Sequence, residues 1–572
     1  DLTLYAQTVV CGAILLLILV VRGAFVRTAD VERQTLLRLF ACLLGAYITL
    51  RYLFWRSLET LNYDNLPSFI GALALYAAEL YGIALYFLGL FVNVYPLTRR
   101  SLPMPDNLET LPTVDVFITS YDEDPTLLET TLLAARSIAY PQNKLKIYLL
   151  DDGATLASRF SRDPAKRQIA FERYQTLIRL CNMARATYLT RIVNDHAKSG
   201  NLNSALQQSD GELILVLDAD HIPTIDILEK TVPFFLHDEK LFLVQTPHYF
   251  ITPDPVERNL QTFHKMPSEN EMFYSVVQPG LDFWDSAFFC GSAAVLKRSH
   301  LQRIGGFATD TVTEDAETSL RLHSLGLHSA YLSTPLTAGL QPGTFVDFVR
   351  QRVRWAQGMT QIFFLHNPLL QRGLRPWQRL GYLNALLFWF FGFARLIFIL
   401  APSAFLLFGW KIYDANLPQV LAFTLPHIFA SWIITDLLFG RYRWPFVSEL
   451  YEYMLSVFTT VAVIKTMFRP RSPRFSVTPK KTHNEGEYVS RFVVPFYALL
   501  AIVIMSLVVG VWRYGAFPDQ TDSIIIGLVW ETFNLVILLG AIGALLERRQ
   551  RRHTPRLNLE LAVELVTASE RT

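Results

Sequence analysis

The sequence predicts an α/β domain inserted between two groups of membrane-spanning helices. Of its 572 residues, 51% are hydrophobic and the mean hydropathy is +0.26, values too apolar for an ordinary soluble protein. Long apolar stretches lie toward both ends of the chain, whereas residues 110–345 alternate between segments of strand and helix character. Lys and Arg number 52 against 50 Asp and Glu, so nothing indicates a nucleic-acid partner. The four cysteines are scattered without metal-ligand spacing, and we expect no disulfide framework.

Seven stretches are apolar enough to cross a bilayer, which takes about 20 residues in a helix. Their residues are 4–21, 36–55, 69–95, 381–408, 420–438, 493–512 and 524–546. Stretch 4–21 has the length of a signal peptide, but no basic region or small-residue cleavage site accompanies it, so we expect an anchor. Residues 346–370 and 451–468 are also apolar, and we expect both to form helices that lie in the membrane interface.

Basic residues follow the first, third and fifth stretches and the last one, and such segments stay in the cytoplasm. We therefore expect the N-terminus outside, and the central block and the C-terminus inside. The predicted segments are three spans in 1–100, the α/β domain in 101–345, an interface helix in 346–375, spans in 376–440, an interface helix and a loop in 441–492, spans in 493–547 and a C-terminal segment in 548–572.

Apolar runs at residues 114–119, 146–150 and 212–217 have the length of buried strands, and helical patterns lie between them. This alternation predicts a mostly parallel sheet, in which ligands bind outside the carboxyl ends of the strands. Acidic residues follow each run, namely Asp122, Glu123, Asp151, Asp152, Asp218 and Asp220. We therefore expect three acidic loops to meet at one edge of the sheet.

Asp218 and Asp220 are the most informative of these residues. Alternate residues of an extended chain point the same way, so both carboxylates can face one divalent cation. Hard oxygen ligands suit Mg²⁺ or Mn²⁺, and such an ion would neutralise the diphosphate of a nucleotide sugar. The alternative is a turn or a helix cap after the strand.

Three further carboxylate and ammonium groups have both a functional and a structural interpretation. Asp151, before Gly153, can accept hydrogen bonds from a uracil or a ribose, or it can belong to a simple Asp-Gly turn. Lys198 can offer its ammonium to a diphosphate, or it can be a solvated surface residue. Asp315 can be the base that deprotonates an attacking hydroxyl, or it can cap the helix that follows.

The run Gln-Arg-Val-Arg-Trp at residues 351–355 is the most specific feature after Asp218 and Asp220. On a helix, Gln351 shares a face with Arg354 or Trp355, which would set a guanidinium on a diphosphate and an indole against a sugar. The alternative is a basic amphipathic helix at the membrane surface. We also expect the apolar turn around Cys290 to border an acceptor, whereas residues 475–480 are either a linker or a loop that closes over a nucleotide.

Eight motifs, taken in order, resemble those of the bacterial cellulose synthase catalytic subunits and the related curdlan synthases, which are processive membrane enzymes of glycosyltransferase family 2. The resemblance runs from about the second span to the last helix. The motifs occupy residues 151–153, 196–201, 218–221, 245–248, 288–292, 313–315, 351–355 and 475–480.

This resemblance implies a GT-A-like cytosolic domain that uses UDP-glucose and Mg²⁺ (or Mn²⁺), in a bacterial inner membrane. The growing β-glucan would leave through a channel between the helices, in contact with membrane lipid. The residues implied are Tyr121, Glu123 and Asp151 near the nucleoside; Lys198 and Arg354 at the diphosphate, with Asp218 and Gln351 also binding the nucleotide; Asp218, Asp220 and His221 at the metal; Asp315 as general base; Cys290, Gly291 and Trp355 at the acceptor; and Phe475, Val477, Thr478 and Lys480 in a gating loop.

Two departures bear on the product. Residues 121–124 read Tyr-Asp-Glu-Asp where cellulose synthases usually have an Asn, and the sequence from Arg552 to Arg556 resembles only the opening of a PilZ domain, the module that binds cyclic di-GMP. Seven spans with an external N-terminus favour curdlan synthase. The sequence thus predicts a processive, inverting β-glucan synthase that secretes its polymer, preferably β-1,3-glucan, with β-1,4-glucan (cellulose) as the alternative.

Two other classes of protein fit the sequence less well. One is a non-processive or hyaluronan-like transferase, which the run at 351–355 and the seven-span frame disfavour. Another is a transporter or channel with a degenerate nucleotide-binding domain, in which the intramembrane charges Glu79, Arg395, Asp436 and Glu531 would contact the substrate. The intact acidic clusters favour an enzyme. The sequence leaves open whether cyclic di-GMP regulates it and whether accessory subunits bind.

Overall fold

A computed structural model describes residues 3–473 and 486–548. In this part of the chain the α/β domain contains a seven-stranded sheet with the order β3-β2-β1-β4-β8-β6-β9. Neighbouring strands pair in parallel except for β8, which is antiparallel to both β4 and β6. The strands are β1 (Val114–Ser120), β2 (Leu145–Asp151), β3 (Thr187–Thr190), β4 (Leu213–Asp218), β6 (Leu241–Gln245), β8 (Ala294–Lys297) and β9 (His328–Tyr331).

Alternating side chains of the sheet enter two separate apolar cores, which explains why the central strands are apolar on both faces. Val116 and Ile118 pack with α4 (Pro125–Arg136), α6 (Pro164–Ala184) and α8 (Ile227–His237) on one face. On the other face Phe117 packs with α7 (Ala197–Gln207) and α13 (Glu314–His323). The shorter elements of the domain are α5 (Leu156–Arg159), β5 (Ile222–Pro223), β7 (Tyr249–Phe250), α9 (Pro255–Leu260), α10 (Glu269–Met272), α11 (Gln278–Phe283), α12 (Arg298–Gln302) and β10 (Thr337–Gly339).

The register of the central strands brings the acidic loops together. Ser120 of β1 is paired with Asp151 of β2, and Thr119 of β1 is paired with Asp218 of β4. The three strands therefore end at the same edge, as the sequence predicts.

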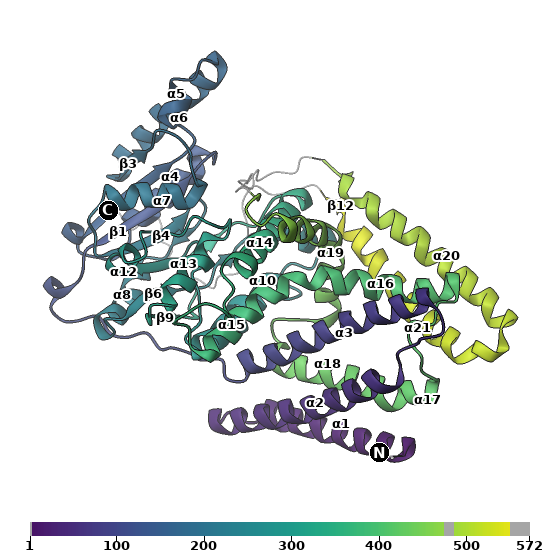
Figure 1. The fold of residues 1–572 in the computed structure, drawn as a ribbon. Coiled ribbons are helices and arrows are strands. Elements are labelled where there is room, and N and C mark those ends of the chain that lie inside the picture. Colours follow the sequence, from purple (N-terminus) through teal and green to yellow (C-terminus); the bar gives the residue numbers. More distant parts are fainter. Residues whose placement is uncertain (1–2, 474–485, 549–572) are drawn as a thin grey trace, which may run out of the picture.

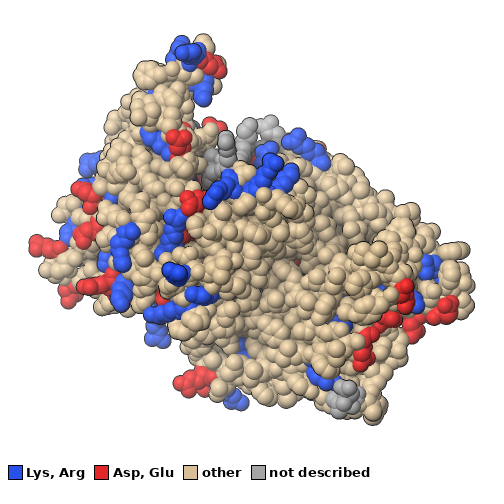
Figure 2. Space-filling view, viewed as in Figure 1, with Lys and Arg blue, Asp and Glu red and all other residues tan. Residues whose placement is uncertain are grey.

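The remaining helices form an elongated bundle beside this domain (Figure 1). Among the described residues, eight helical segments have the length and composition to cross a membrane. They lie within α1 (Leu4–Arg27), α2 (Val31–Glu59), α3 (Leu66–Asn93), α15 and α16 (Pro376–Leu387 and Phe391–Phe408), α17 and α18 (Leu417–Gln419 and Leu425–Phe439), α19 (Pro445–Phe468), α20 (Val494–Ala516) and α21 (Thr521–Ala544). Charged side chains on the face shown in Figure 2 gather over the α/β domain and are sparse over most of the bundle.

Seven of these segments match the predicted spans, and the eighth lies in α19, which the sequence analysis assigns to the membrane interface. Eight candidates thus replace the predicted seven, because α19 qualifies by length and composition as well. The interface assignment of α19, and the orientation of the C-terminus that depends on it, stay predictions.

Helix α14 (Phe345–Leu365) joins the two parts of the molecule and lies between the sheet and α19 in Figure 1. Its first residues pack with α19 and with the end of α21 in one apolar cluster. The architecture is therefore the predicted one, an α/β domain inserted in a helical membrane domain.

Candidate active site

One cavity of about 640 Å³ begins at the acidic edge of the sheet and continues between the membrane helices. Of the described residues that the sequence analysis places in a site, all but Asp151 line it. These are Tyr121, Glu123, Lys198, Asp218, Asp220, His221, Cys290, Gly291, Asp315, Gln351, Arg354 and Trp355. Farther in, its walls come from α3, α16, α18 and α19, through side chains such as Tyr81, Phe398, Leu438 and Glu452.

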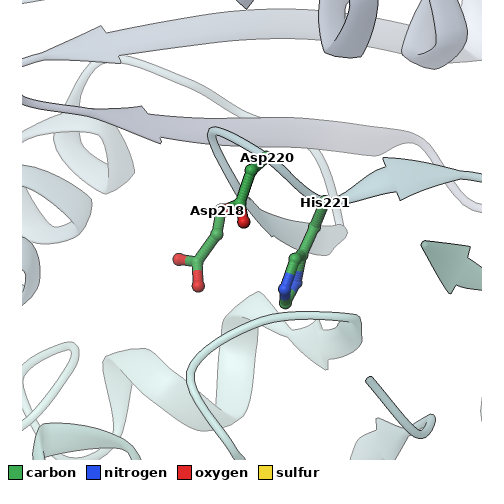
Figure 3. Close-up of side chains that lie close together, drawn as sticks. All are labelled: Asp218, Asp220 and His221. Atoms are coloured by element: carbon green, nitrogen blue, oxygen red, sulfur yellow. The ribbon is translucent and has the colours of Figure 1, made fainter. Parts of the chain in front are cut away.

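Asp218, Asp220 and His221 form a cluster that can hold a metal ion. Their side chains point to the same side of the loop after β4 (Figure 3), and one potential ligand atom from each lies within 4.8 Å of the others. The backbone N–H of Leu340 donates to Asp220 Oδ2 at 3.1 Å, and His221 Nδ1 lies 2.7 Å from Ser292 Oγ. The cluster is consistent with the prediction that the carboxylates of Asp218 and Asp220 face one cation, and their oxygen donors fit Mg²⁺ or Mn²⁺.

Lys198 connects the metal-binding cluster to the proposed base. Its ammonium forms an ion pair with Asp218 and donates to the carbonyl oxygen of Gly291 at 2.7 Å. Gly291 has φ +86°, and a Cβ atom at this position would lie 3.1 Å from Asp315 Oδ2. Glycine therefore allows the backbone to pass close to Asp315. The ammonium of Lys198 lies near the carboxylates of both Asp218 and Asp315.

Asp315 occupies the first turn of α13 and is half-buried. Burial raises the pKa of its carboxyl group, and the backbone N–H of Ala316 and the charges of Lys198 and Arg354 partly offset this effect. Burial together with the charge of Asp315 raises the pKa of the neighbouring Glu314 to about 7. A carboxylate with a raised pKa is a better proton acceptor than an exposed aspartate, as a general base requires.

The run at residues 351–355 divides between two faces of α14. Gln351, Arg354 and Trp355 line the cavity, whereas the buried Arg352 forms an ion pair with Glu269. The guanidinium of Arg352 also lies 4.3 Å from the ring centroid of Trp355 and fixes the indole by a cation–π contact. Burial lowers the pKa of Arg354, and the charges of Glu314, Asp218 and Asp315 oppose that shift.

The loop after β1 and the start of the loop after β2 also contribute to the cavity wall. Glu123 accepts hydrogen bonds from the backbone N–H groups of Tyr121 at 2.6 Å and Asp122 at 3.1 Å. Asp152 lines the cavity and forms a two-point ion pair with Arg191 at 2.6 and 2.7 Å.

Asp151 does not reach the cavity. It is fully buried, and its carboxylate accepts hydrogen bonds from Arg173 Nε at 3.0 Å, from the Tyr188 hydroxyl at 3.0 Å and from the backbone N–H of Ala154 at 2.8 Å. The structure thus brings Asp152, rather than the predicted Asp151, to the wall of the cavity. The two residues point to opposite sides because they are adjacent at the end of a strand.

His248 is a cavity residue to which the sequence analysis gives no role, although it lies in one of the eight motifs. Its ring lies 4.6 Å from that of His221, Nε2 lies 3.0 Å from the carbonyl oxygen of Ser292, and Nδ1 lies 2.9 Å from the Tyr274 hydroxyl. Burial, followed by the nearby His221, lowers its pKa to about 3. His248 is therefore neutral at physiological pH and supports the wall of the metal-binding cluster.

The intramembrane charges that the channel hypothesis requires have partners inside the protein. Glu79 pairs with Arg56 at 2.6 Å, Asp436 with Arg22 at 2.5 Å and Arg395 with Glu452 at 2.5 Å. Glu531 accepts a hydrogen bond from Ser403 at 2.5 Å. The predicted gating loop with Phe475, Val477, Thr478 and Lys480, and the PilZ-like segment with Arg552 and Arg556, lie outside the described residues.

Two family models match the chain. One, described as "Glycosyl transferase family 2", covers residues 115–305, and the other, described as "Glycosyl transferase family group 2", covers residues 213–435. A solved mannosyltransferase from Pyrobaculum calidifontis, in complex with GDP-Man and Mn²⁺, aligns with 71% of this chain and all of its own, at 20% identity and a TM-score of 0.44.

Curated relatives share more of the sequence. The "Cellulose synthase catalytic subunit [UDP-forming]" of Pseudomonas fluorescens is 37% identical over 573 residues, which cover all of this chain and 74% of the relative. "Cellulose synthase 2" of Novacetimonas hansenii is 41% identical over 534 residues, or 92% of this chain. The chain spans 32% of that longer protein. These relatives are cellulose synthases, and nothing among them supports the curdlan interpretation.

Proposed function

Because the chain belongs to the bacterial cellulose synthase catalytic subunits of glycosyltransferase family 2, we propose that it polymerises glucose from UDP-glucose into β-1,4-glucan and secretes the polymer. The predicted alternative, cellulose, thus replaces the preferred β-1,3-glucan. The curdlan interpretation depended partly on a count of seven spans, and the described residues contain eight candidates.

The observation that carries the proposal is that a single cavity contains Asp218, Asp315 and Trp355 and continues between the membrane helices. A processive enzyme must keep its acceptor bound while each sugar is added. An enzyme that also secretes its product must conduct the polymer across the bilayer. A cavity shared by the reacting groups and the helices supports both steps. Aromatic side chains along its wall provide flat faces for glucose rings.

The transfer step assigns a role to each group. Asp315 accepts the proton of the acceptor's 4-hydroxyl while the hydroxyl oxygen bonds to the anomeric carbon, and the bond from that carbon to UDP breaks. UDP leaves with the bonding electrons, and Lys198 and Arg354 stabilise the charge that develops on its diphosphate. When bound by Asp218, Asp220 and His221, Mg²⁺ or Mn²⁺ supplies further positive charge to that diphosphate. Trp355 holds the terminal sugar so that the correct hydroxyl faces the donor.

The location follows from the same chemistry. We propose a multi-pass protein of the bacterial inner membrane with its catalytic domain in the cytosol, because nucleotide sugars are made there. The partners are UDP-glucose, the glucan and membrane lipid.

The proposal is tested with protein purified in detergent or nanodiscs, UDP-[¹⁴C]glucose and Mg²⁺. We expect labelled, insoluble polymer that an endo-β-1,4-glucanase degrades and an endo-β-1,3-glucanase leaves intact. The opposite digestion pattern would restore the curdlan interpretation. Transfer from another UDP-sugar but not from UDP-glucose would refute the substrate.

A further inference from the structure

Gln361 is a buried residue of α14 that lies outside the cavity wall, two turns beyond Arg354. Its Oε1 accepts a hydrogen bond from the backbone N–H of Val312 at 2.8 Å, and its Nε2 donates to the carbonyl oxygen of Pro470 at 2.8 Å. The two bonds fix the orientation of the carboxamide. One side chain therefore ties the chain before α13 and the chain after α19 to the same helix.

The conformation of the segment before Asp315 depends on hydrogen bonds to buried side chains. Residues 310–313 precede α13 without forming a helix or a strand, and Thr311, Val312 and Thr313 are buried. The backbone N–H of Thr311 donates to Glu317 Oε2 at 3.0 Å, and that of Val312 donates to Gln361. A buried N–H group without a partner is costly, so loss of the Gln361 carboxamide would release this segment.

The segment also touches α14 directly. A Cβ atom on Gly358 would lie 2.4 Å from the Thr313 hydroxyl oxygen, so this glycine permits the contact. Arg354, Gly358 and Gln361 follow one another at helical spacing on a single face of α14. The face that presents Arg354 to the diphosphate therefore also holds the peptide before Asp315.

We propose that Gln361 is a positioning residue for Asp315. It keeps the residues before the base against α14, so that the base and Arg354 hold a fixed separation while the acceptor is deprotonated and UDP departs. This inference rests on the proposed function, in which Asp315 is the base. A displacement of about 1 Å in a reacting group can cost about 100-fold in rate, which makes such a tie consequential.

Gln361→Met tests the proposal, because it removes both hydrogen bonds and nearly keeps the side-chain volume. Gln378→Met is the matched control. Gln378 is also a buried helical glutamine; it donates to the Asp285 carbonyl oxygen at 2.7 Å and accepts from the Arg375 backbone N–H at 3.0 Å, away from the cavity. We expect Gln361→Met to lower kcat roughly 10- to 100-fold and to change the inhibition constant of UDP less than about twofold. The control should retain the wild-type kcat.

A kcat near wild type in Gln361→Met would overturn the proposal. A parallel loss of UDP affinity would also overturn it, because Gln361 would then support the nucleotide site rather than the base. Hydrogen exchange of the full chain gives a readout that does not depend on substrate. Amides of residues 308–316 should exchange faster in Gln361→Met and at the wild-type rate in Gln378→Met.

Unchanged exchange in Gln361→Met would refute the tie whatever the activity. If wild-type protein transfers no glucose from UDP-glucose, the proposed function fails. The exchange experiment then still decides whether Gln361 fixes this segment.

Discussion

Asp315, the proposed base, lies near two cations, Lys198 and Arg354, which the proposed mechanism also places at the diphosphate. In the proposed mechanism the base and the leaving group thus share their counter-charges. The same mechanism keeps both cations beside Asp315 when UDP leaves and Asp315 receives the proton. The two cations partly offset the rise in the pKa of Asp315 that burial causes.

Replacement of the base gives the first prediction. Asp315→Asn keeps the shape of the side chain but cannot accept the proton, so we expect glucose transfer to fall by roughly 100- to 10,000-fold. The inhibition constant of UDP should change little. Asp310→Asn is the control, since Asp310 is an exposed carboxylate of the same segment and pairs with Arg321 away from the cavity. Polymer synthesis by Asp315→Asn at the rate of the control would show that another group is the base.

The second prediction concerns pH. Burial raises the pKa of Asp315 above that of an ordinary aspartate, which is about 3.9. The base works only when it is deprotonated, so kcat/KM should fall as the pH falls through the raised pKa, with a slope of one on logarithmic axes. The measurement is kcat/KM for UDP-glucose against pH at saturating Mg²⁺. An acid limb that begins only at the pKa of an exposed aspartate would contradict this assignment.

At the scale of single elements, α14 separates two kinds of side chain by helical spacing. Its cavity face carries Gln351, Arg354 and Trp355, and its other side buries Arg352 against Glu269. The sequence alone predicts the shared face. In the structure Trp355 also lies edge-on to Trp389, with ring centroids 6.1 Å apart and an interplanar angle of 78°. The indole is therefore oriented before any sugar arrives.

This orientation leads to the third prediction. Trp355→Ala removes the flat face for the acceptor, and we expect polymer synthesis to fall by about tenfold or more while the UDP inhibition constant stays near wild type. Trp377→Ala is the matched control, because Trp377 is an exposed tryptophan at the start of α15, away from the cavity. Equal polymer yields from both variants would mean that the acceptor binds elsewhere.

At the scale of the whole molecule, a buried carboxylate is one of the contacts that join the α/β domain to the end of α21. Glu547, just after α21, forms an ion pair with Arg258 of α9 and accepts a hydrogen bond from the backbone N–H of Phe345 at 2.5 Å. Its side chain is fully buried. Phe345 is the first residue of α14, so the contact joins the end of the bundle to the helix that carries Arg354.

The fourth prediction follows from this junction. Glu547→Ala leaves the largely buried Arg258 without a carboxylate partner, and we expect a loss of about 3 kcal/mol of stability, measured as thermal unfolding in detergent. The double variant Glu547→Ala, Arg258→Met should recover part of that loss, because the unpaired charge is removed. Additive losses in the double variant would show that the two side chains are energetically independent.

Local patterns predicted much of this architecture. The strands around Phe117, Leu149 and Leu215 are apolar on both faces because they are buried on both faces, and this composition is visible without any tertiary contact. The acidic loops could be placed at one edge because parallel strands all end on the same side of a sheet. Helix spacing likewise placed Gln351 on one face with Arg354 or Trp355.

Only the tertiary structure decided which neighbour of a pair faces the cavity and what holds it there. Asp151 and Asp152 have the same local context, and the choice between them depends on Arg173 and Arg191, which reach them from other elements. Gln361 gains its importance from contacts with residues far away in sequence. The sequence by itself determined the elements, their order and the chemistry available, because these depend on periodicity and residue type. Distances between side chains depend on long-range packing, which a local sequence pattern does not specify.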